Sequence, residues 1–173
     1  MLSAMEIYTI KFEDQLKTLR QKALPIEDID DSIVKLAEDM IATMIKAEGI
    51  GLAGPQVGIG KRIFTVKTGK GAPLVFINPE ITSTSISLSR FEEGCLSIPG
   101  QYASIERPGA IQIYAWNHLG RAFNLEATGL LATVIQHEFD HLNGILFIDH
   151  MSSWGRNKIL GKFNLAGQKA SGD

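Results

Sequence analysis

The segment His137-Glu138-Phe139-Asp140-His141 has an H-E-x-x-H pattern, with two histidines four residues apart and a glutamate directly after the first. On an α-helix, residues four apart lie on one face, one turn above each other, so His137 and His141 can direct two imidazoles at one point. That geometry suits a divalent metal ion, and Glu138 can take a proton from a water that the metal polarises. The alternative is a pair of core histidines with ordinary hydrogen-bond partners. The spacing favours the metal.

A catalytic site of this kind needs a third protein ligand and an open position. Phe147 stands where a metzincin would have its third histidine, so that pattern fails. His150 lies in a polar stretch beyond the expected helix, and His118 lies in an expected hairpin turn, where solvent would surround it. Cys95 is the remaining candidate, although a lone cysteine is more often a small buried apolar residue.

The neighbours of Cys95 support a role as a ligand. Gly94 permits a close backbone approach to another group. The negative charges of Glu92 and Glu93 disfavour a thiolate nucleophile unless a cation lies beside it. The backbone N–H of Leu96 could face a substrate oxygen. The stretch therefore predicts a metal-bound thiolate rather than a cysteine hydrolase.

A buried helix must position the two histidines. Residues 130–142 are apolar almost all round the helix, which predicts a core helix, and Gly144 is expected to end it in a left-handed conformation. A second, N-terminal helix is expected from about Ser32 to Ala47, capped by Asp30 or Asp31, and a short C-terminal helix from Ser152 or Ser153 to about Phe163.

The stretch Gly49 to Gly60 is rich in glycine but has neither the Lys-Ser/Thr of a phosphate loop nor a G-x-G-x-x-G pattern. Its apolar residues suit a loop packed beside a cleft. Gln56 is its only side chain with a strong directed donor. A flexible surface loop is the alternative.

Alternating or β-branched segments predict several antiparallel strands. Arg62–Lys67 and Pro73–Ile77 are expected to pair, with Asn78-Pro79 breaking the second. Residues 81–88 are expected to form an edge strand, residues 110–117 and 122–126 a hairpin, and residues 146–148 a short strand. The pattern predicts an α+β fold in which antiparallel β-sheets pack around the buried H-E-x-x-H helix.

Composition limits the class of protein. The chain has 173 residues, a net charge of −2 and one cysteine. These values fit one domain over residues 1–173, with residues 1–5 as a candidate leader and residues 164–173 as a polar tail. A single cysteine excludes an intramolecular disulfide and fits a reducing compartment. We expect no DNA partner, no membrane partner and no secretion signal.

Three stretches together resemble the signature motifs of the bacterial peptide deformylases, in their order and spacing: GIGLAGPQ (49–56), EGCLS (93–97) and QHEFDH (136–141). The resemblance extends from about residue 19 to the end of the 140s. It implies a cytoplasmic bacterial enzyme that removes formyl from the N-terminal formyl-methionine of nascent peptides and releases formate.

The resemblance also implies roles for individual residues. Cys95, His137 and His141 would bind one Fe²⁺, with Zn²⁺, Ni²⁺ or Co²⁺ as substitutes. Glu138 would be the general acid and base, and the Gln56 amide and the Leu96 N–H would hold the formyl oxygen. Substrate-binding positions, most of them around the methionine side chain, would be Gly49, Ile50, Gly51, Phe91, Glu93, Leu130 and Val134.

Gly54 and Tyr102 depart from the family pattern, where alanine and, in some relatives, arginine are found. The resemblance makes the ribosome a candidate partner through a basic C-terminal segment with Arg156, Lys158, Lys162 and Lys169, for which a solvated helix face is the alternative. Two further functions stay open on the residues alone: a metallopeptidase with the same metal helix, and a structural metal-binding module associated with the ribosome.

Overall fold

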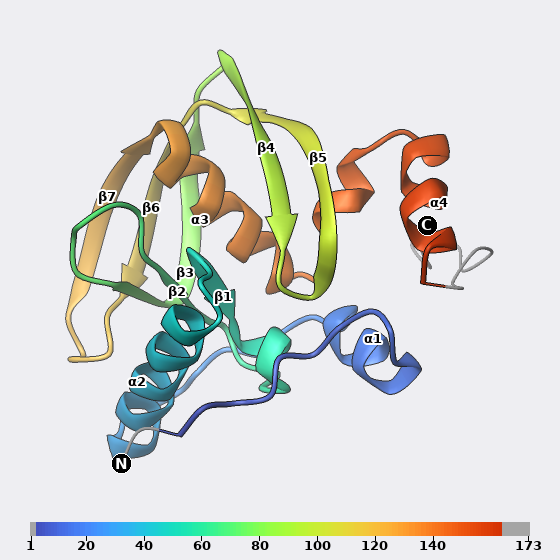
Figure 1. The fold of residues 1–173 in the computed structure, drawn as a ribbon. Coiled ribbons are helices and arrows are strands. Elements are labelled where there is room, and N and C mark those ends of the chain that lie inside the picture. Colours follow the sequence, from blue (N-terminus) through green and yellow to red (C-terminus); the bar gives the residue numbers. More distant parts are fainter. Residues whose placement is uncertain (1–2, 164–173) are drawn as a thin grey trace.

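The computed structural model describes residues 3–163, and its central element is helix α3 (Gly129–His141), which lies between two layers of antiparallel strands. On one side is a five-stranded sheet, and on the other a long two-stranded hairpin crosses the helix (Figure 1). This arrangement confirms the expected α+β fold with sheets around a buried H-E-x-x-H helix.

The larger sheet has the strand order β1 (Gly51–Ala53), β2 (Ile63–Val66), β3 (Leu74–Thr84), β6 (Ala110–Trp116) and β7 (Ala122–Thr128). The hairpin pairs β4 (Leu88–Cys95) with β5 (Ile98–Pro108). All of these pairings are antiparallel. The expected β6–β7 hairpin is confirmed, and it leads directly into α3.

Strand β2 is buried on both faces of the sheet. Phe64 and Val66 pack in the cluster that includes Ile135 of α3, whereas Ile63 packs with Met40 of helix α2 (Asp31–Lys46). Successive strand residues point to opposite faces, so a sheet covered by helices on both sides has strands without polar alternation. All four residues of β2 are accordingly buried.

The observed helices agree in part with those predicted from the sequence. Helix α2 begins one residue before the expected start, and Asp30 caps it by accepting hydrogen bonds from the N–H groups of Ser32 and Ile33. Helix α4 (Ser153–Gly161) is capped by Ser152. Gly144 is left-handed as expected, at φ 72°, but α3 already ends at His141. The 3₁₀ helix η1 (Gly54–Val57) lies in the glycine-rich stretch.

One local expectation was wrong, and one helix was missed. Residues 147–150 form a 3₁₀ helix, η2 (Phe147–His150), instead of a strand over 146–148. A short helix that the sequence did not predict, α1 (Glu13–Leu19), precedes α2. Its Leu19 is fully buried against the cluster that holds Phe147, so tertiary packing stabilises a segment too short for a clear helical period.

The expected strand break at Asn78-Pro79 was also wrong. Strand β3 continues through it to Thr84. From Glu80 onward β3 pairs with β6 alone, because β2 pairs only with residues 74–77. Residues 81–84 are therefore at an edge as expected, although they belong to β3 and the strand ends at Thr84 rather than at residue 88. The pairing shifts between Ile77 and Glu80, which is a β-bulge. Asn78 adopts φ 49°, and its side-chain amide exchanges two 2.8 Å hydrogen bonds with the backbone of Ile26. The bulge places Pro79, which has no N–H, where no ladder bond is needed.

No helix within residues 3–163 has the length and apolar character to cross a membrane. The expected polar tail (164–173), with Lys169, lies outside the described residues, as do the first two residues of the candidate leader.

Candidate active site

Three of the predicted residues meet at the crossing of α3 and the β4–β5 hairpin. Cys95 is the last residue of β4, and His137 and His141 are one turn apart on α3. One ligand atom from each lies within 4.8 Å of the other two, and the Cys95 Sγ is 3.3 Å from His141 Nε2. A thiolate with two imidazoles fits a nitrogen- and sulfur-preferring divalent metal, and three ligands leave a coordination position open. The predicted Cys/His/His metal site is confirmed.

A buried carboxylate orients the first histidine. Glu93 Oε1 lies 2.9 Å from His137 Nδ1, which fixes the ring and leaves Nε2 for the metal. The Arg107 guanidinium holds the same carboxylate from the other side, with its Nε 2.7 Å from Glu93 Oε2 and its Nη2 3.0 Å from Oε1. Burial alone would raise the pKa of Glu93, but the hydrogen bonds to His137 and Arg107 outweigh it and lower the pKa to about 2. Glu93 is therefore a paired anion and not a free charge beside the thiol.

Arg107 also connects this pair to the far side of α3. Its Nη1 donates to Asp140 Oδ2 over 2.9 Å, and His150 Nε2 lies 2.7 Å from the same oxygen. The polar stretch around His150 is thus attached to the metal helix rather than freely solvated. Two carboxylates and one guanidinium satisfy each other where an unpaired charge would be costly.

Glu138 lies next to the metal ligands and is 3 % exposed. Burial raises the pKa of its carboxyl to about 7, although the positive charge of His137 acts in the opposite direction. A proton acceptor and donor with a pKa near neutrality suits acid–base catalysis. A Cβ at Gly51 would lie 2.3 Å from Glu138 Oε1, so only glycine leaves room for this carboxylate.

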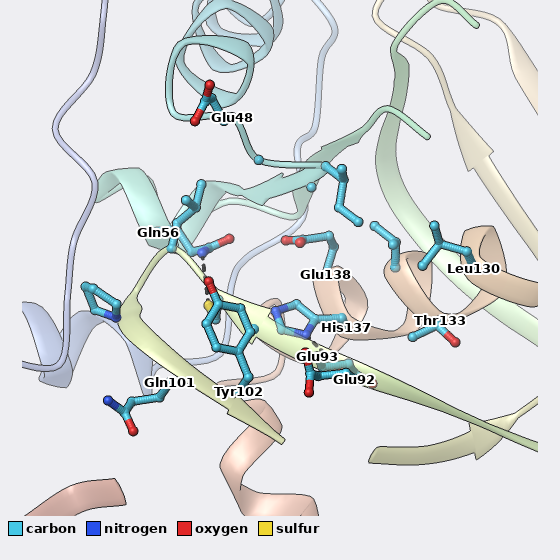
Figure 2. A pocket seen from close by; sticks show the side chains of 18 of the residues that line it. Glu48, Gln56, Glu92, Glu93, Gln101, Tyr102, Leu130, Thr133, His137 and Glu138 are labelled. Atoms are coloured by element: carbon cyan, nitrogen blue, oxygen red, sulfur yellow. Dashed lines mark hydrogen bonds and ion pairs between the residues drawn. The ribbon is translucent and has the colours of Figure 1, made fainter. Parts of the chain in front are cut away.

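The glycine-rich stretch supplies one polar side chain to the cavity, that of Gln56. The Oε1 of Gln56 accepts the Ala53 N–H over 2.9 Å, and this bond turns the amide nitrogen toward the cavity. Nε2 lies 3.4 Å from Cys95 Sγ and 3.2 Å from Ser97 Oγ. Figure 2 shows the Glu138 carboxylate directed toward the Gln56 amide, with His137 beside it. The Gly54 departure does not loosen this loop, since a Cβ there would meet the carbonyls of Ile59 and Lys61 at 2.8 Å.

A cavity of about 530 Å³ opens over these groups. Most of the predicted substrate-binding residues line it, together with the catalytic candidates: Gly49, Ile50, Gly51, Gln56, Glu93, Cys95, Leu96, Leu130, Val134, His137 and Glu138. Phe91 is not among the lining residues. Glu92 and Gly94 of the same strand are, together with Tyr102, which pairs with Gly94 on the hairpin, and Glu48. Leu130 is 45 % exposed although it lies on the core helix, because it faces this opening.

The two histidines differ electrostatically. For His137, burial would lower the pKa, but the hydrogen bonds with Cys95 and Glu93 and the negative charges of Cys95 and Glu138 raise it well above its ordinary value. For His141, burial and the positive charge of His137 lower the pKa well below its ordinary value. A metal ion requires both imidazoles neutral and the thiol ionised, so metal binding releases protons from this site.

Sequence reasoning missed Arg107 and Ser97. Arg107 lies in a strand and before a proline, without any motif spacing that relates it to His137. No strand was predicted over this segment, so the β4–β5 hairpin that brings Arg107 to Glu93 was missed with it. Ser97 belongs to the EGCLS motif (93–97). Its hydroxyl, two residues from the Cys95 thiol, could have been predicted as a hydrogen-bond partner of the Gln56 amide.

Known proteins resemble this chain over nearly its whole length. The family model of polypeptide deformylases matches residues 7–157. A peptide deformylase of Cellvibrio japonicus is 51 % identical over 83 % of this chain and 86 % of its own length. One from Mesorhizobium japonicum is 48 % identical over 89 % of this chain and 90 % of its own.

Solved structures agree with these sequences. A peptide deformylase from Synechococcus elongatus in complex with actinonin superimposes with a TM-score of 0.87 at 40 % identity, covering 95 % of this chain and 90 % of that one. A peptide deformylase from Legionella pneumophila gives a TM-score of 0.86 at 37 % identity, with 94 % of each chain covered.

Proposed function

This chain belongs to the polypeptide deformylase family, and we propose that Glu138, Gln56 and Leu96 are the groups with which it hydrolyses the formyl group from N-terminal formyl-methionine. It is a peptide deformylase with a Cys95/His137/His141 metal site, and its substrates are formylated peptides. The observation that carries the assignment of roles is that Glu138 and Gln56 line one cavity with two of the metal ligands, Cys95 and His137.

The metal would act as a Lewis acid that makes a water more acidic at neutral pH. Glu138 takes the proton of the attacking water. A pKa of about 7 lets this carboxyl hold the proton and then pass it to the departing amine nitrogen. Its burial at 3 % exposure limits exchange of that proton with solvent.

Two donors stabilise the negative charge that develops on the formyl oxygen. The Gln56 Nε2 carries two hydrogens, one directed at Cys95 Sγ and one at Ser97 Oγ. The 3.4 Å contact with sulfur is the weaker of the two, so it is the one that a substrate oxygen replaces. The N–H of Leu96, in the turn that joins β4 and β5, is the second donor. Loss of one such donor costs about 100- to 1,000-fold in turnover.

The apolar end of the cavity takes the methionine side chain. Ile50, Leu130 and Val134 present apolar surface to it, and Gly49 and Gly51 leave the β1 edge open to the substrate backbone. Glu93 belongs to the wall but its carboxylate is occupied by Arg107 and His137. We propose that it orients the metal site and that only its stem borders the substrate.

The natural metal that we propose is Fe²⁺. A thiolate beside Fe²⁺ is open to oxidation, so activity should decay in air and persist under nitrogen. Measurement of metal content and activity in anaerobically purified protein tests this. An iron-containing sample whose activity is stable in air would contradict it, whereas zinc, nickel or cobalt forms should be stable.

We also propose one catalytic domain over residues 1–173, acting in the bacterial cytoplasm where formylated chains are made.

The ribosome stays a candidate partner. Two of the four basic side chains considered for it are engaged within the described structure, since Lys158 lies over the Trp154 ring and Lys162 donates to Gln101. Cosedimentation with ribosomes tests the contact.

Formate release from formyl-Met-Ala-Ser is the experiment for the function. Anaerobically purified protein should release formate, a chelator should stop it, and added Co²⁺ should restore it. A folded, metal-loaded sample that releases none would overturn the assignment of these residues.

A further inference from the structure

The cavity wall holds a buried hydroxyl that the chemistry above does not use. Thr133 lies on α3 one turn before His137, lines the cavity, and is 3 % exposed (Figure 2). Its Oγ1 has no hydrogen-bond partner among the described residues. Buried hydroxyls are nearly always paired, because leaving one unpaired costs free energy.

The usual partner of such a hydroxyl is missing from this helix. A threonine inside a helix commonly donates to the carbonyl four residues earlier, which here belongs to Gly129. No such bond is present, and Gly129 adopts φ 59° at the first position of α3. The lining residues beside Thr133 on this helix are Leu130 and Val134, which offer no side-chain acceptor.

The methionine side chain of the substrate carries one hydrogen-bond acceptor, its thioether sulfur. We propose that the Thr133 hydroxyl donates a hydrogen bond to the thioether sulfur of the bound formyl-methionine and selects methionine over side chains of the same shape. This inference rests on the proposed function. Methionine sulfur is a weak acceptor, whereas the matching methylene of norleucine is none.

The spacing along α3 agrees with this contact. Thr133 and His137 are four residues apart, about 6 Å along the helix. A methionine sulfur stands three bonds beyond Cα, so a side chain that leaves the reacting centre along α3 brings sulfur to the level of Thr133. The Oγ1 atom is enclosed in the free protein. Contact with the sulfur therefore requires a change of χ1 that turns the hydroxyl toward the cavity, and threonine in a helix has two favoured χ1 settings.

The test combines an isosteric change in the protein, threonine to valine, with one in the substrate, methionine to norleucine. Formate release is measured from formyl-Met-Ala-Ser and formyl-norleucine-Ala-Ser with the wild-type protein, Thr133→Val, Thr133→Ser and Thr128→Val. Thr128 precedes the same helix, is exposed and makes no cap hydrogen bond, so it is the matched control.

The wild-type protein and Thr133→Ser should prefer methionine over norleucine by roughly two- to tenfold in kcat/KM, the range of one modest hydrogen bond. Thr133→Val should lose this preference through a higher KM for the methionine substrate, with its kcat unchanged, because the sulfur is remote from the reacting bond. Thr128→Val should retain the preference.

Three results would overturn the proposal: no preference in the wild-type protein, an unchanged preference in Thr133→Val, or an equal loss for both substrates, which would mark a merely structural role. If Thr133→Val does not fold, Thr133→Ala replaces it, since it also lacks the hydroxyl. Failure of the deformylase function itself looks different, because neither substrate would then release formate.

Discussion

His137 Nδ1 and Glu93 Oε1 lie 2.9 Å apart although they come from the core helix and from the hairpin that crosses it. Arg107, also on the hairpin, holds the Glu93 carboxylate in place. The hairpin therefore contributes both a metal ligand, Cys95, and the groups that orient a ligand on the helix. Metal binding and the packing of these two elements are coupled.

Removal of Arg107 should weaken the metal site without removing a ligand. Arg107→Met leaves the buried Glu93 and the half-buried Asp140 without their cation, and Arg107→Lys keeps the charge but loses the bidentate contact with Glu93. We expect metal affinity to fall by about 10- to 100-fold in Arg107→Lys, measured by competition with a chelator. Arg90→Met, which breaks an exposed pair with Glu106 on the same hairpin, is the control. Equal affinities of Arg107→Lys and the control would refute the coupling.

Glu138→Gln should bind metal and lose turnover. The amide has the same shape as the carboxyl but cannot accept the proton of the attacking water, so kcat should fall by about 100- to 10,000-fold. Metal content, measured on the same sample, should stay at one ion per chain. Near-normal turnover would remove Glu138 as the general base.

Each metal ligand should be needed for metal retention. Cys95→Ala, His137→Ala and His141→Ala each leave two ligands from a set of three, and we expect none of them to retain metal after dialysis against a chelator that the wild-type protein withstands. His118→Ala, in the β6–β7 turn, should behave like the wild type. Full affinity in Cys95→Ala would mean that the third ligand is another residue.

Gly51→Ala should impair catalysis through Glu138. Its new Cβ would lie 2.3 Å from Glu138 Oε1, so the carboxylate must move. A displacement of about 1 Å can cost about 100-fold in rate, and because the three atoms nearest to the new Cβ all belong to Glu138 and not to a metal ligand, metal content should be unchanged. Gly60→Ala is the control, since a Cβ there meets nothing within 4 Å. Equal kcat in the two variants would show that the site tolerates the shift.

The Glu93 ion pair should make stability fall in acid. Its folded-state pKa of about 2 lies below the ordinary value of 4.5, so its contribution is complete above pH 4.5 and is lost as the pH falls toward 2. Between pH 5 and pH 3 the metal-free wild type should lose about 2 kcal/mol more unfolding free energy than Glu93→Gln. Urea unfolding at both pH values measures this, and parallel losses would contradict the low pKa.

The sequence predicted the parts of the site that depend on local spacing. His137, Glu138 and His141 are related by one helical turn, and the β6–β7 hairpin by a short turn, so both follow from nearby residues. The third ligand required more. Elimination of Phe147, His150 and His118 and the neighbours of Cys95 made it the predicted ligand, and the resemblance to a family agreed with that choice.

What the sequence could not predict depends on contacts between distant segments. Asn78 looks like a strand breaker until its amide is seen to bond the backbone of Ile26. Nothing in the sequence relates Arg107 to Glu93 and Asp140, which it contacts only because the hairpin crosses α3. Phe91 was expected at the methionine pocket, and it lies outside the cavity while its strand neighbour Glu93 lines it. Such pairings fix register and charge partners, and no local pattern encodes them.

The most direct measurement of the central claim identifies the bond that is cut. Metal-loaded protein is incubated with formyl-Met-Ala-Ser, and the products are separated and identified by mass spectrometry. We predict formate and Met-Ala-Ser in equal amounts, with Glu138→Gln yielding neither. Formyl-Met together with Ala-Ser would instead mean that this site cuts peptide bonds, and it would contradict the assignment of the cavity to the formyl group.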